Sequence, residues 1–323
     1  MTDSPTAMSS IFLRSRQKRL SSLTRWFGRR FGYWWYPWPL HNPVANWMHL
    51  AAYRGWQRAL GRPPILVLTV GKVGSTSVVS ALRRVGIPHV VHLHAVTPDG
   101  AGYHRQRYLA ERRRSGQPDL PVSRHVDHAD HYGRWATRSL PHGQRWPLIT
   151  LVRDPVARNL SSRFARFRGD AAQQLEAAGK LDEFVHESLL EQDRWTRSLD
   201  WFDQEVRPVF GLDLWSGPSL ADRGHVVLEN QRSRMLVLKL ERLDQDGPAA
   251  LREFLGLRDE PTLGRERRSA DHPRGVAYRR FCRSFVLPAD VAERVYGDPR
   301  LQHLYSAEEI AGMRERWSAT PRD

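Results

Sequence analysis

Short apolar runs of strand length alternate along this chain with segments in which apolar residues recur at helical spacing. Residues 65–70 (ILVLTV) form the first run, and residues 75–85 carry Val78, Leu82 and Val85 on one helical face. Further runs that predict strands are residues 89–93, 148–152, 226–228 and 235–240. Further segments that predict helices are residues 181–206, 248–255 and 306–317.

Several helix boundaries carry sequence signals of their own. Pro155 suits the first turn of a helix that follows a strand, and Gly256 suits a helix C-terminus. Residues 306–309 (SAEE) form a capping box at the start of the last helix. Residues 99–145, by contrast, are polar, rich in Arg and His and poorly periodic, which predicts an irregular excursion with some helix. The length of that segment suggests a functional role.

The alternation of strands with helices predicts an α/β fold with a central parallel sheet flanked by helices. We expect a basic, tryptophan-rich N-terminal arm over residues 1–60 and one domain over residues 61–323. Within that domain, residues 265–323 would form a basic loop and the last helices. A chain of 323 residues is long enough for one such domain with a substantial core.

The N-terminal arm combines basic and aromatic residues over positions 14–40, including the run FGYWWYPWPL. No run in it reaches the roughly 18 apolar residues of a membrane-spanning helix, and none resembles a signal peptide. Arginine beside clustered tryptophan and tyrosine is typical of contact with an anionic membrane surface. The alternative is an arm that packs its aromatic residues on the domain, which Trp47 and Trp56 favour.

Composition narrows the class of protein. Hydrophobic residues make up 40% of the chain and charged residues 26%, as in globular domains. The net charge of +15 favours polyanionic partners, such as nucleic acid, anionic lipid or an acidic ligand. The single cysteine, Cys282, excludes disulfides within the chain and suggests a reducing compartment. We therefore expect a cytoplasmic protein, with any membrane contact peripheral and at the inner face.

The loop after the first strand, residues 69–77 (TVGKVGSTS), has the features of a phosphate-binding loop. Gly74 permits close backbone approach, and the residues after it open a helix whose amides and dipole attract an anion. Lysine occurs at only four positions in the chain, and Lys72 supplies a compact cation that can reach a bridging oxygen. The alternative is a plain turn with serine caps. The candidate phosphate ligands are Lys72, Gly74, Ser75, Thr76 and Ser77.

A second phosphate-site signal follows the strand at 148–152. Arg153 can make a forked, charge-assisted contact with phosphate, and Ser161 lies eight residues later on the next helix. Two such loops on strands of one sheet can hold both ends of a nucleotide with phosphate at its 5′ and 3′ positions. The alternative is an ordinary strand exit in which Arg153 pairs with Asp154 and Pro155 starts a helix.

These motifs resemble those of the sulfotransferases that use 3′-phosphoadenosine 5′-phosphosulfate (PAPS). Residues 72–76 (KVGST) are similar to their 5′-phosphosulfate loop, and the pair Arg153 and Ser161 is similar to their 3′-phosphate site. Four further segments resemble a bacterial family of sulfotransferases described for capsular polysaccharide synthesis, namely residues 200–206, 209–214, 237–243 and 305–310. The resemblance covers roughly residues 64–317 and leaves the N-terminal arm outside.

The resemblance implies a three-layer sandwich like that of the P-loop NTPases, and transfer of a sulfuryl group from PAPS to a hydroxyl. It implies that Lys72 contacts the bridging oxygen, that the loop amides hold the 5′-phosphate, and that Arg153 and Ser161 hold the 3′-phosphate. PAPS would be the co-substrate and no metal would be required. The expected partner is a hydroxylated acceptor, a carbohydrate or polysaccharide, and nucleic acid is not expected.

Sulfuryl transfer also needs a base that takes the proton of the acceptor hydroxyl, and histidine is a usual one. His92 and His94 lie two apart at a predicted strand end and so point to one face. We expect His94, nearer the strand exit, to be the base, with His92 second. A zinc-binding pair is the alternative, although no nearby cysteine supports it. Other candidates for the base are His125, Glu205 and Asp203.

Two other classes of function remain open. A P-loop kinase or NTPase requires a lysine directly after the second glycine of its loop, whereas Lys72 precedes Gly74 here. A basic module for membrane or nucleic acid requires basic and aromatic residues interleaved on one surface, which only the N-terminal arm resembles. A late basic stretch, which would either close over the nucleotide or form a solvated face, comprises Arg265, Arg267, Arg268 and Arg274.

Overall fold

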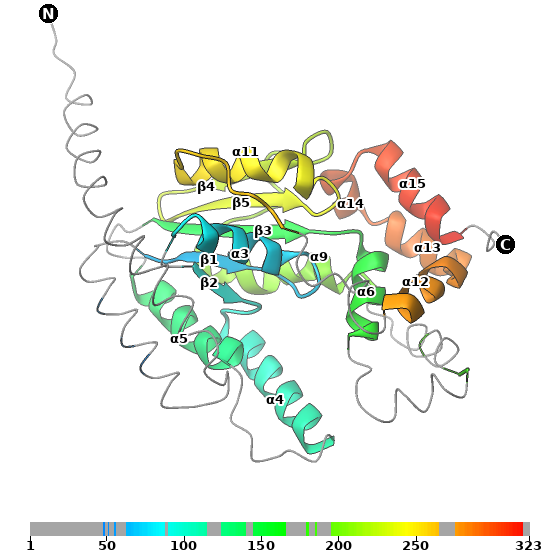
Figure 1. The fold of residues 1–323 in the computed structure, drawn as a ribbon, viewed down its shortest axis with the longest axis horizontal. Helices are drawn as coiled ribbons and strands as arrows, with labels where there is room; N and C mark the ends of the chain where they lie inside the picture. The colour runs from blue at the N-terminus through cyan, green and yellow to red at the C-terminus, as the bar shows by residue number, and fades with distance from the viewer. Residues whose placement is uncertain are drawn as a thin grey trace, which may run out of the picture.

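The structure is a computed structural model, and it describes most of the predicted domain. The described residues are 63–87, 90–114, 124–139, 145–165, 195–264 and 275–318, with single positions at 48, 51, 55, 179, 180 and 185. The predicted membrane-contact segment 14–40, the basic stretch 265–274 and the side chain of His125 lie outside the described residues. The described elements form a sheet between two layers of helices (Figure 1).

The sheet has five strands in the order β2-β1-β3-β5-β4. β1 pairs in parallel with β2 and with β3, and β3 pairs in parallel with β5. This confirms the predicted α/β fold with a mainly parallel sheet. The strand bounds are β1 Ile65–Leu68, β2 Val90–Leu93, β3 Trp146–Val152, β4 His225–Glu229 and β5 Ser233–Lys239.

The edge strand β4 runs antiparallel to β5, which differs from a purely parallel sheet. Only residues 230–232 join the two strands, and a parallel crossover needs a dozen residues or more. Asn230 closes the hairpin, because its Oδ1 accepts from the backbone amides of Arg232 and Ser233, at 2.8 Å each. The short connection therefore decides the direction of this strand.

Helices connect and cover the strands. Among the described residues, no helix is long and apolar enough to cross a membrane. The bounds before β4 are α3 Ser75–Arg84, α4 Pro98–Arg114, α5 Arg124–Ser139, α6 Pro155–Phe164, α9 Arg197–Trp201, the π-helix η2 Phe202–Val206 and α10 Arg207–Phe210. The bounds after β5 are α11 Leu243–Leu255, α12 Gly275–Ser284, α13 Ala289–Tyr296, α14 Pro299–Leu304 and α15 Ala307–Ser318.

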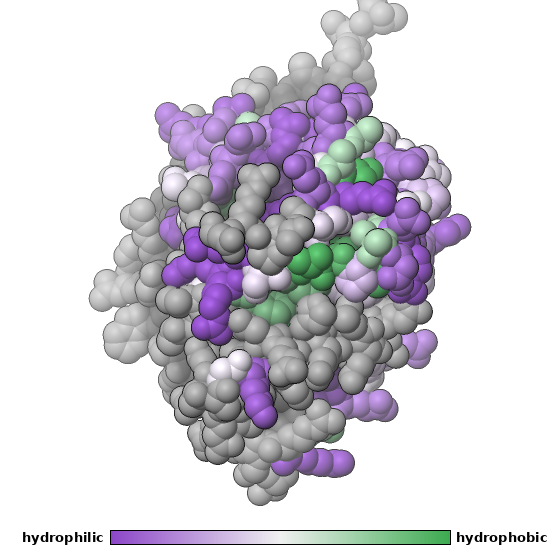
Figure 2. Space-filling view, turned by 90° about the vertical axis from the view of Figure 1, so that its right-hand side faces the viewer, coloured by the Kyte–Doolittle hydropathy of each residue, from purple (hydrophilic) through white to green (hydrophobic). Residues whose placement is uncertain are grey.

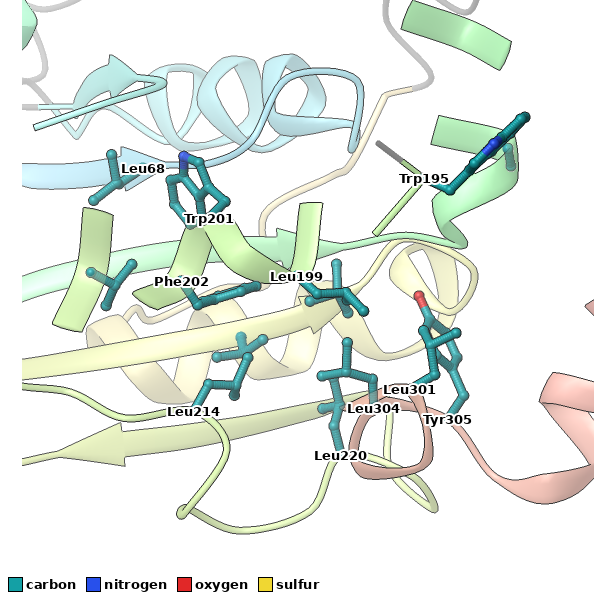
Figure 3. Close-up of a cluster of buried hydrophobic side chains, with 14 of the residues drawn as sticks. Leu68, Trp195, Leu199, Trp201, Phe202, Leu214, Leu220, Leu301, Leu304 and Tyr305 are labelled. Carbon is teal, nitrogen blue, oxygen red and sulfur yellow. The ribbon is translucent and has the colours of Figure 1, made fainter. Parts of the chain in front are cut away.

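Each face of the sheet has its own apolar core, because successive strand residues point to opposite faces. Val67 of β1 belongs to the cluster formed with α3 and α11. Leu66 and Leu68 belong to the larger cluster on the other face, which includes Trp201 and the C-terminal helices. Figure 3 shows part of this larger cluster. Burial on both faces explains why the strands read as continuous apolar runs.

The expectation of an irregular excursion with some helix over residues 99–145 understates how much of the segment is helical. The segment contains α4 and α5, two helices of 17 and 16 residues. The buried face of α5 is made of His128, Ala129, Tyr132 and Ala136 rather than of large aliphatic residues. α4 has almost no amphipathic periodicity, and α5 has a periodic face but is polar overall, so the segment reads as a polar stretch in the sequence.

The helix boundaries that carried a proline, glycine or capping-box signal are confirmed. Pro155 is the first residue of α6, and Gly256 ends α11 with a φ of 62°. In the capping box, the Ser306 amide donates to Glu309 Oε2 at 2.9 Å and the Glu309 amide donates to Ser306 Oγ at 3.2 Å. α11 begins at Leu243, five residues earlier than predicted, with its proline inside the helix.

Candidate functional site

The two predicted phosphate loops lie beside each other, because β1 and β3 are neighbouring parallel strands. Arg153, directly after β3, donates from Nη1 to the carbonyl oxygen of Lys72 at 2.9 Å. Arg158 of α6 donates from Nε to the carbonyl oxygen of Gly71 at 3.1 Å. Two arginines from the second loop and its helix therefore hold the backbone of the first loop.

The first loop has an unusual backbone conformation at Lys72 and Gly74. Lys72 has a φ of 76°, the one positive value at a non-glycine position in the described part of the chain. Such a value costs free energy and is most often kept at functional sites. Gly74, with a φ of 81°, is the N-cap of α3 and makes no side-chain hydrogen bond to its first turn. That arrangement suits an anion at the start of α3.

Arg153 and Asp154 do not form the ion pair considered from the sequence. Asp154 is buried and accepts hydrogen bonds from Trp317 Nε1 at 2.7 Å, from the Val156 amide at 2.9 Å and from Tyr296 Oη at 3.1 Å. Its carboxylate thus caps α6 and fastens the C-terminal helices to the end of β3. The guanidinium of Arg153 is consequently left for Lys72 and the loop.

A second carboxylate, Glu241, lies after β5 and supports the same region. Its Oε1 accepts from the Asp154 amide at 2.9 Å, and its Oε2 accepts from Tyr305 Oη at 3.2 Å. Burial raises the pKa of both Glu241 and Asp154, and their mutual repulsion raises that of Glu241 further. The ends of β3 and β5 are therefore joined through these two side chains.

Ser161 and the α12 residue Tyr278 complete the surroundings of the second loop. Ser161 of α6 is 3% exposed. Burial raises the pKa of Tyr278 to about 12, and a hydrogen bond with Arg153 acts in the opposite direction. Arg153 therefore lies between the first loop and α12.

A cleft of about 740 Å³ opens beside the first loop. Of the predicted site residues, His94 is among the residues that line this cleft. The predicted site residues that do not line it are Lys72, residues 74–77, Arg153, Ser161 and His92. Figure 2 shows the side of the molecule toward which β3 and β5 run, where hydrophilic residues surround a small apolar centre. Lining residues from the loop and four helices include Gly71, Tyr103, Arg107, Arg158, Arg197 and Glu205.

His94 is held in one tautomer and one position. Its Nδ1 lies 2.8 Å from the carbonyl oxygen of Thr69. A carbonyl oxygen only accepts hydrogen bonds, so Nδ1 carries the proton and Nε2 is the proton-accepting atom of the neutral ring. Trp201 Nε1 donates to the His94 carbonyl oxygen at 2.9 Å and fixes the backbone. The ring of His92 meets the ring of His94 edge-on, at 4.8 Å between centroids.

Glu205, considered from the sequence as an alternative base, is committed to backbone amides. Its Oε2 accepts from Val96 N at 2.7 Å and from Thr97 N at 2.9 Å. Burial raises the pKa of this carboxyl, and the two amide hydrogen bonds oppose that shift. Glu205 therefore anchors the segment between His94 and α4. Asp203, the other carboxylate of the π-helix, accepts from Trp215 Nε1 at 3.0 Å.

Sequence reasoning missed the α4 side of the cleft. Burial lowers the pKa of His104 to about 4, and the positive charges of Arg107, Arg197 and Arg158 lower it in the same direction. The ring of His104 lies 6.3 Å from that of His94. The polar segment 99–145 was expected to contain some helix and to be functional, but nothing in it singled out His104 or Arg107. In the described part of the chain, no group of three or more His, Cys, Asp or Glu side chains could hold a metal ion.

The fold is an α/β sandwich in which a hydrogen bond from Arg153 joins two strand-to-helix loops. Comparison with known proteins gives one match, to part of the chain. Residues 178–306 match the NKWYS family model, described as "Putative capsular polysaccharide synthesis protein". The match includes η2 and Glu205 and does not include either predicted phosphate loop. Neither a curated protein nor a solved structure matches the chain.

Proposed function

We propose that this protein transfers a sulfuryl group from PAPS to a hydroxyl of a saccharide used in capsular polysaccharide synthesis. The observation that carries the proposal is the hydrogen bond from Arg153 to the Lys72 carbonyl, which joins the two predicted phosphate loops. These loops lie next to a cleft that His94 lines. The family model matched by residues 178–306 supports a saccharide as the acceptor.

The residues of the two loops fit a donor with phosphate at both ends. The first-turn amides of α3 and the hydroxyls of residues 75–77 would hold the 5′-phosphosulfate, with Lys72 at its bridging oxygen. Arg153 and Ser161 would hold the 3′-phosphate, because a guanidinium has five N–H donors and Lys72 takes one. PAPS supplies an activated sulfuryl group when bound.

The chemistry at the cleft needs a proton acceptor and a stabilised leaving group. His94 Nε2 would take the proton of the acceptor hydroxyl as its oxygen forms a bond to sulfur. The sulfur–oxygen bond to the 5′-phosphate breaks, and its electron pair leaves on the phosphate oxygen beside Lys72. The Thr69 carbonyl holds the Nδ1 proton and favours the imidazolium that forms. Most of the rate enhancement would come from alignment and electrostatics.

Isotope transfer tests this proposal against a kinase. The protein is incubated with a mixture of neutral and uronate-containing oligosaccharides, with either ³⁵S-labelled PAPS or γ-³²P-labelled ATP and Mg²⁺. We expect ³⁵S in the saccharide fraction and a loss on the order of 100-fold or more for His94→Asn. Arg145→Ala is the control, because Arg145 is exposed just before β3, at the end of the strand opposite Arg153. Label from ATP, or ³⁵S transfer unchanged in His94→Asn, would contradict the proposal.

A further inference from the structure

The cleft beside His94 is lined by arginines from three helices. These arginines are Arg107 of α4, Arg158 and Arg163 of α6, and Arg197 of α9. The carboxylates among the lining residues are Asp99 and Glu205, and Glu205 accepts from two backbone amides. The described wall of the cleft is therefore strongly positive.

Arg107 and Arg197 have no carboxylate to balance them in the described part of the chain. Neither forms an ion pair there with an Asp or Glu. Arg197 instead donates from Nη1 to Tyr103 Oη at 3.0 Å, and its Cζ lies 4.4 Å from the centre of the Tyr103 ring. Stacking on an aromatic ring orients the guanidinium while other N–H groups stay available to a ligand.

The effect of these cations reaches the interior of the cleft. Burial and the charges of Arg107, Arg197 and Arg158 lower the pKa of His104. Burial would raise the pKa of Tyr103, but Arg197 and Arg107 lower it overall. Because the ring of His104 is 6.3 Å from that of His94, the positive wall lies close to the proposed base. A cleft that gathers cations in this way favours an anionic ligand.

The residues proposed to hold the phosphate groups of the donor do not belong to this wall. The residues proposed to hold the donor, namely Lys72, residues 74–77, Arg153 and Ser161, do not line the cleft. Arg107 and Arg197 come from α4 and α9, whereas the donor residues belong to the two loops, α3 and α6. Among the described residues no carboxylate pairs with them, so an anion on the second substrate is the partner that fits them.

We propose that the acceptor is an acidic saccharide, and that Arg107 and Arg197 bind its anionic group while the reacting hydroxyl faces His94. This inference rests on the proposed function, which supplies the second substrate. Paired or stacked guanidinium groups suit a carboxylate, phosphate or sulfate, all of which present oxygens in matching geometry. A neutral sugar would leave these half-buried arginines without a counter-charge among the described residues.

A glycan array tests the inference by binding rather than by turnover. The array carries neutral glycans, glycans with uronate, sialate, phosphate or sulfate groups, and carboxyl-reduced partners of the uronates. It is probed with the full chain in the presence and absence of adenosine 3′,5′-bisphosphate. We expect binding confined to acidic glycans, at least a tenfold loss on carboxyl reduction, and a similar loss in Arg107→Ala and Arg197→Ala.

Arg105→Ala is the matched control, because Arg105 lies on the same helix as Arg107, is exposed and does not line the cleft. Binding of adenosine 3′,5′-bisphosphate by each variant is measured separately by calorimetry. Unchanged nucleotide binding shows that a variant is folded. If the parent protein itself binds no adenosine 3′,5′-bisphosphate, that result counts against the proposed function and not against the acidic acceptor. Binding of neutral glycans, acidic binding that survives in both arginine variants, or no acidic binder would overturn the inference.

Discussion

Lys72 and Gly74 show how the first loop takes its shape at the level of single residues. Both have positive φ values, and the Lys72 carbonyl accepts a hydrogen bond from Arg153, which follows the neighbouring strand β3. A Cβ on Gly74 would lie 2.5 Å from Leu240 Cδ1. Glycine is required there both by the backbone conformation and by the packing of β5's end against the loop.

Gly74→Ala should therefore destabilise the protein by about 1–3 kcal/mol, since it combines a positive φ with a close contact. Binding of adenosine 3′,5′-bisphosphate should weaken as well, because the start of α3 would shift. Gly71→Ala is the control for stability, because nothing lies within 4 Å of its added Cβ. Urea unfolding of the two variants measures the difference. Equal midpoints would show that the loop is not constrained at Gly74.

The elements differ in how far their sequences predicted them. Continuous apolar runs predicted β1, β3 and β5, and the proline and glycine signals at α6 and α11 were read correctly. α5 was expected only as unspecified helix in a polar segment, because it is polar overall and its buried face is made of His, Ala and Tyr. Residues 202–206 were expected to be helical, but their π-helical form was not, because one extra residue in a helical turn leaves no sequence signal; this form points Glu205 at the amides before α4. The arginines of the cleft wall come from α4, α6 and α9, which are far apart in the sequence, so their meeting at one cleft could not be predicted.

The close approach of α5 to the segment after β2 gives a test at this scale. A Cβ on Gly133 would overlap the carbonyl oxygen of Val96, which neighbours the amides held by Glu205. Gly133→Ala should therefore destabilise the protein by about 1–3 kcal/mol, as overpacking does. Gly102→Ala in α4 meets nothing within 4 Å and should be neutral or stabilising by up to about 1 kcal/mol. Thermal unfolding that ranks the two variants in the reverse order would refute this packing.

In the molecule as a whole, two carboxylates, Asp154 and Glu241, connect the sheet to the C-terminal helices. Asp154 accepts from Tyr296 of α13 and Trp317 of α15, and Glu241 accepts from Tyr305. None of these partners could be predicted from the sequence, because they lie 60 or more positions apart. The connection matters for the site, since Asp154 directly follows Arg153.

The raised pKa values predict a pH dependence of stability. A carboxyl with a raised pKa in the folded state binds its proton more tightly than in the unfolded state. The contribution of Glu241 is therefore complete below its ordinary value of 4.5 and is lost as the pH rises through the raised pKa. Glu241→Gln should reduce the loss of stability over that range, because the amide stays neutral and can still accept from the Asp154 amide. Urea unfolding between pH 5 and 8 measures it, and parallel curves for both proteins would contradict it.

The central claim is that the two joined loops form one site for a nucleotide with phosphate at both ends. The most direct measurement is calorimetric binding of adenosine 3′,5′-bisphosphate without metal, compared with 5′-AMP and with Mg-ATP. We predict tight binding of the bisphosphate, weakened at least tenfold by Arg153→Ala and by Ser161→Ala and unchanged by Arg145→Ala. Equal or tighter binding of Mg-ATP, or no nucleotide binding by the folded protein, would contradict the claim.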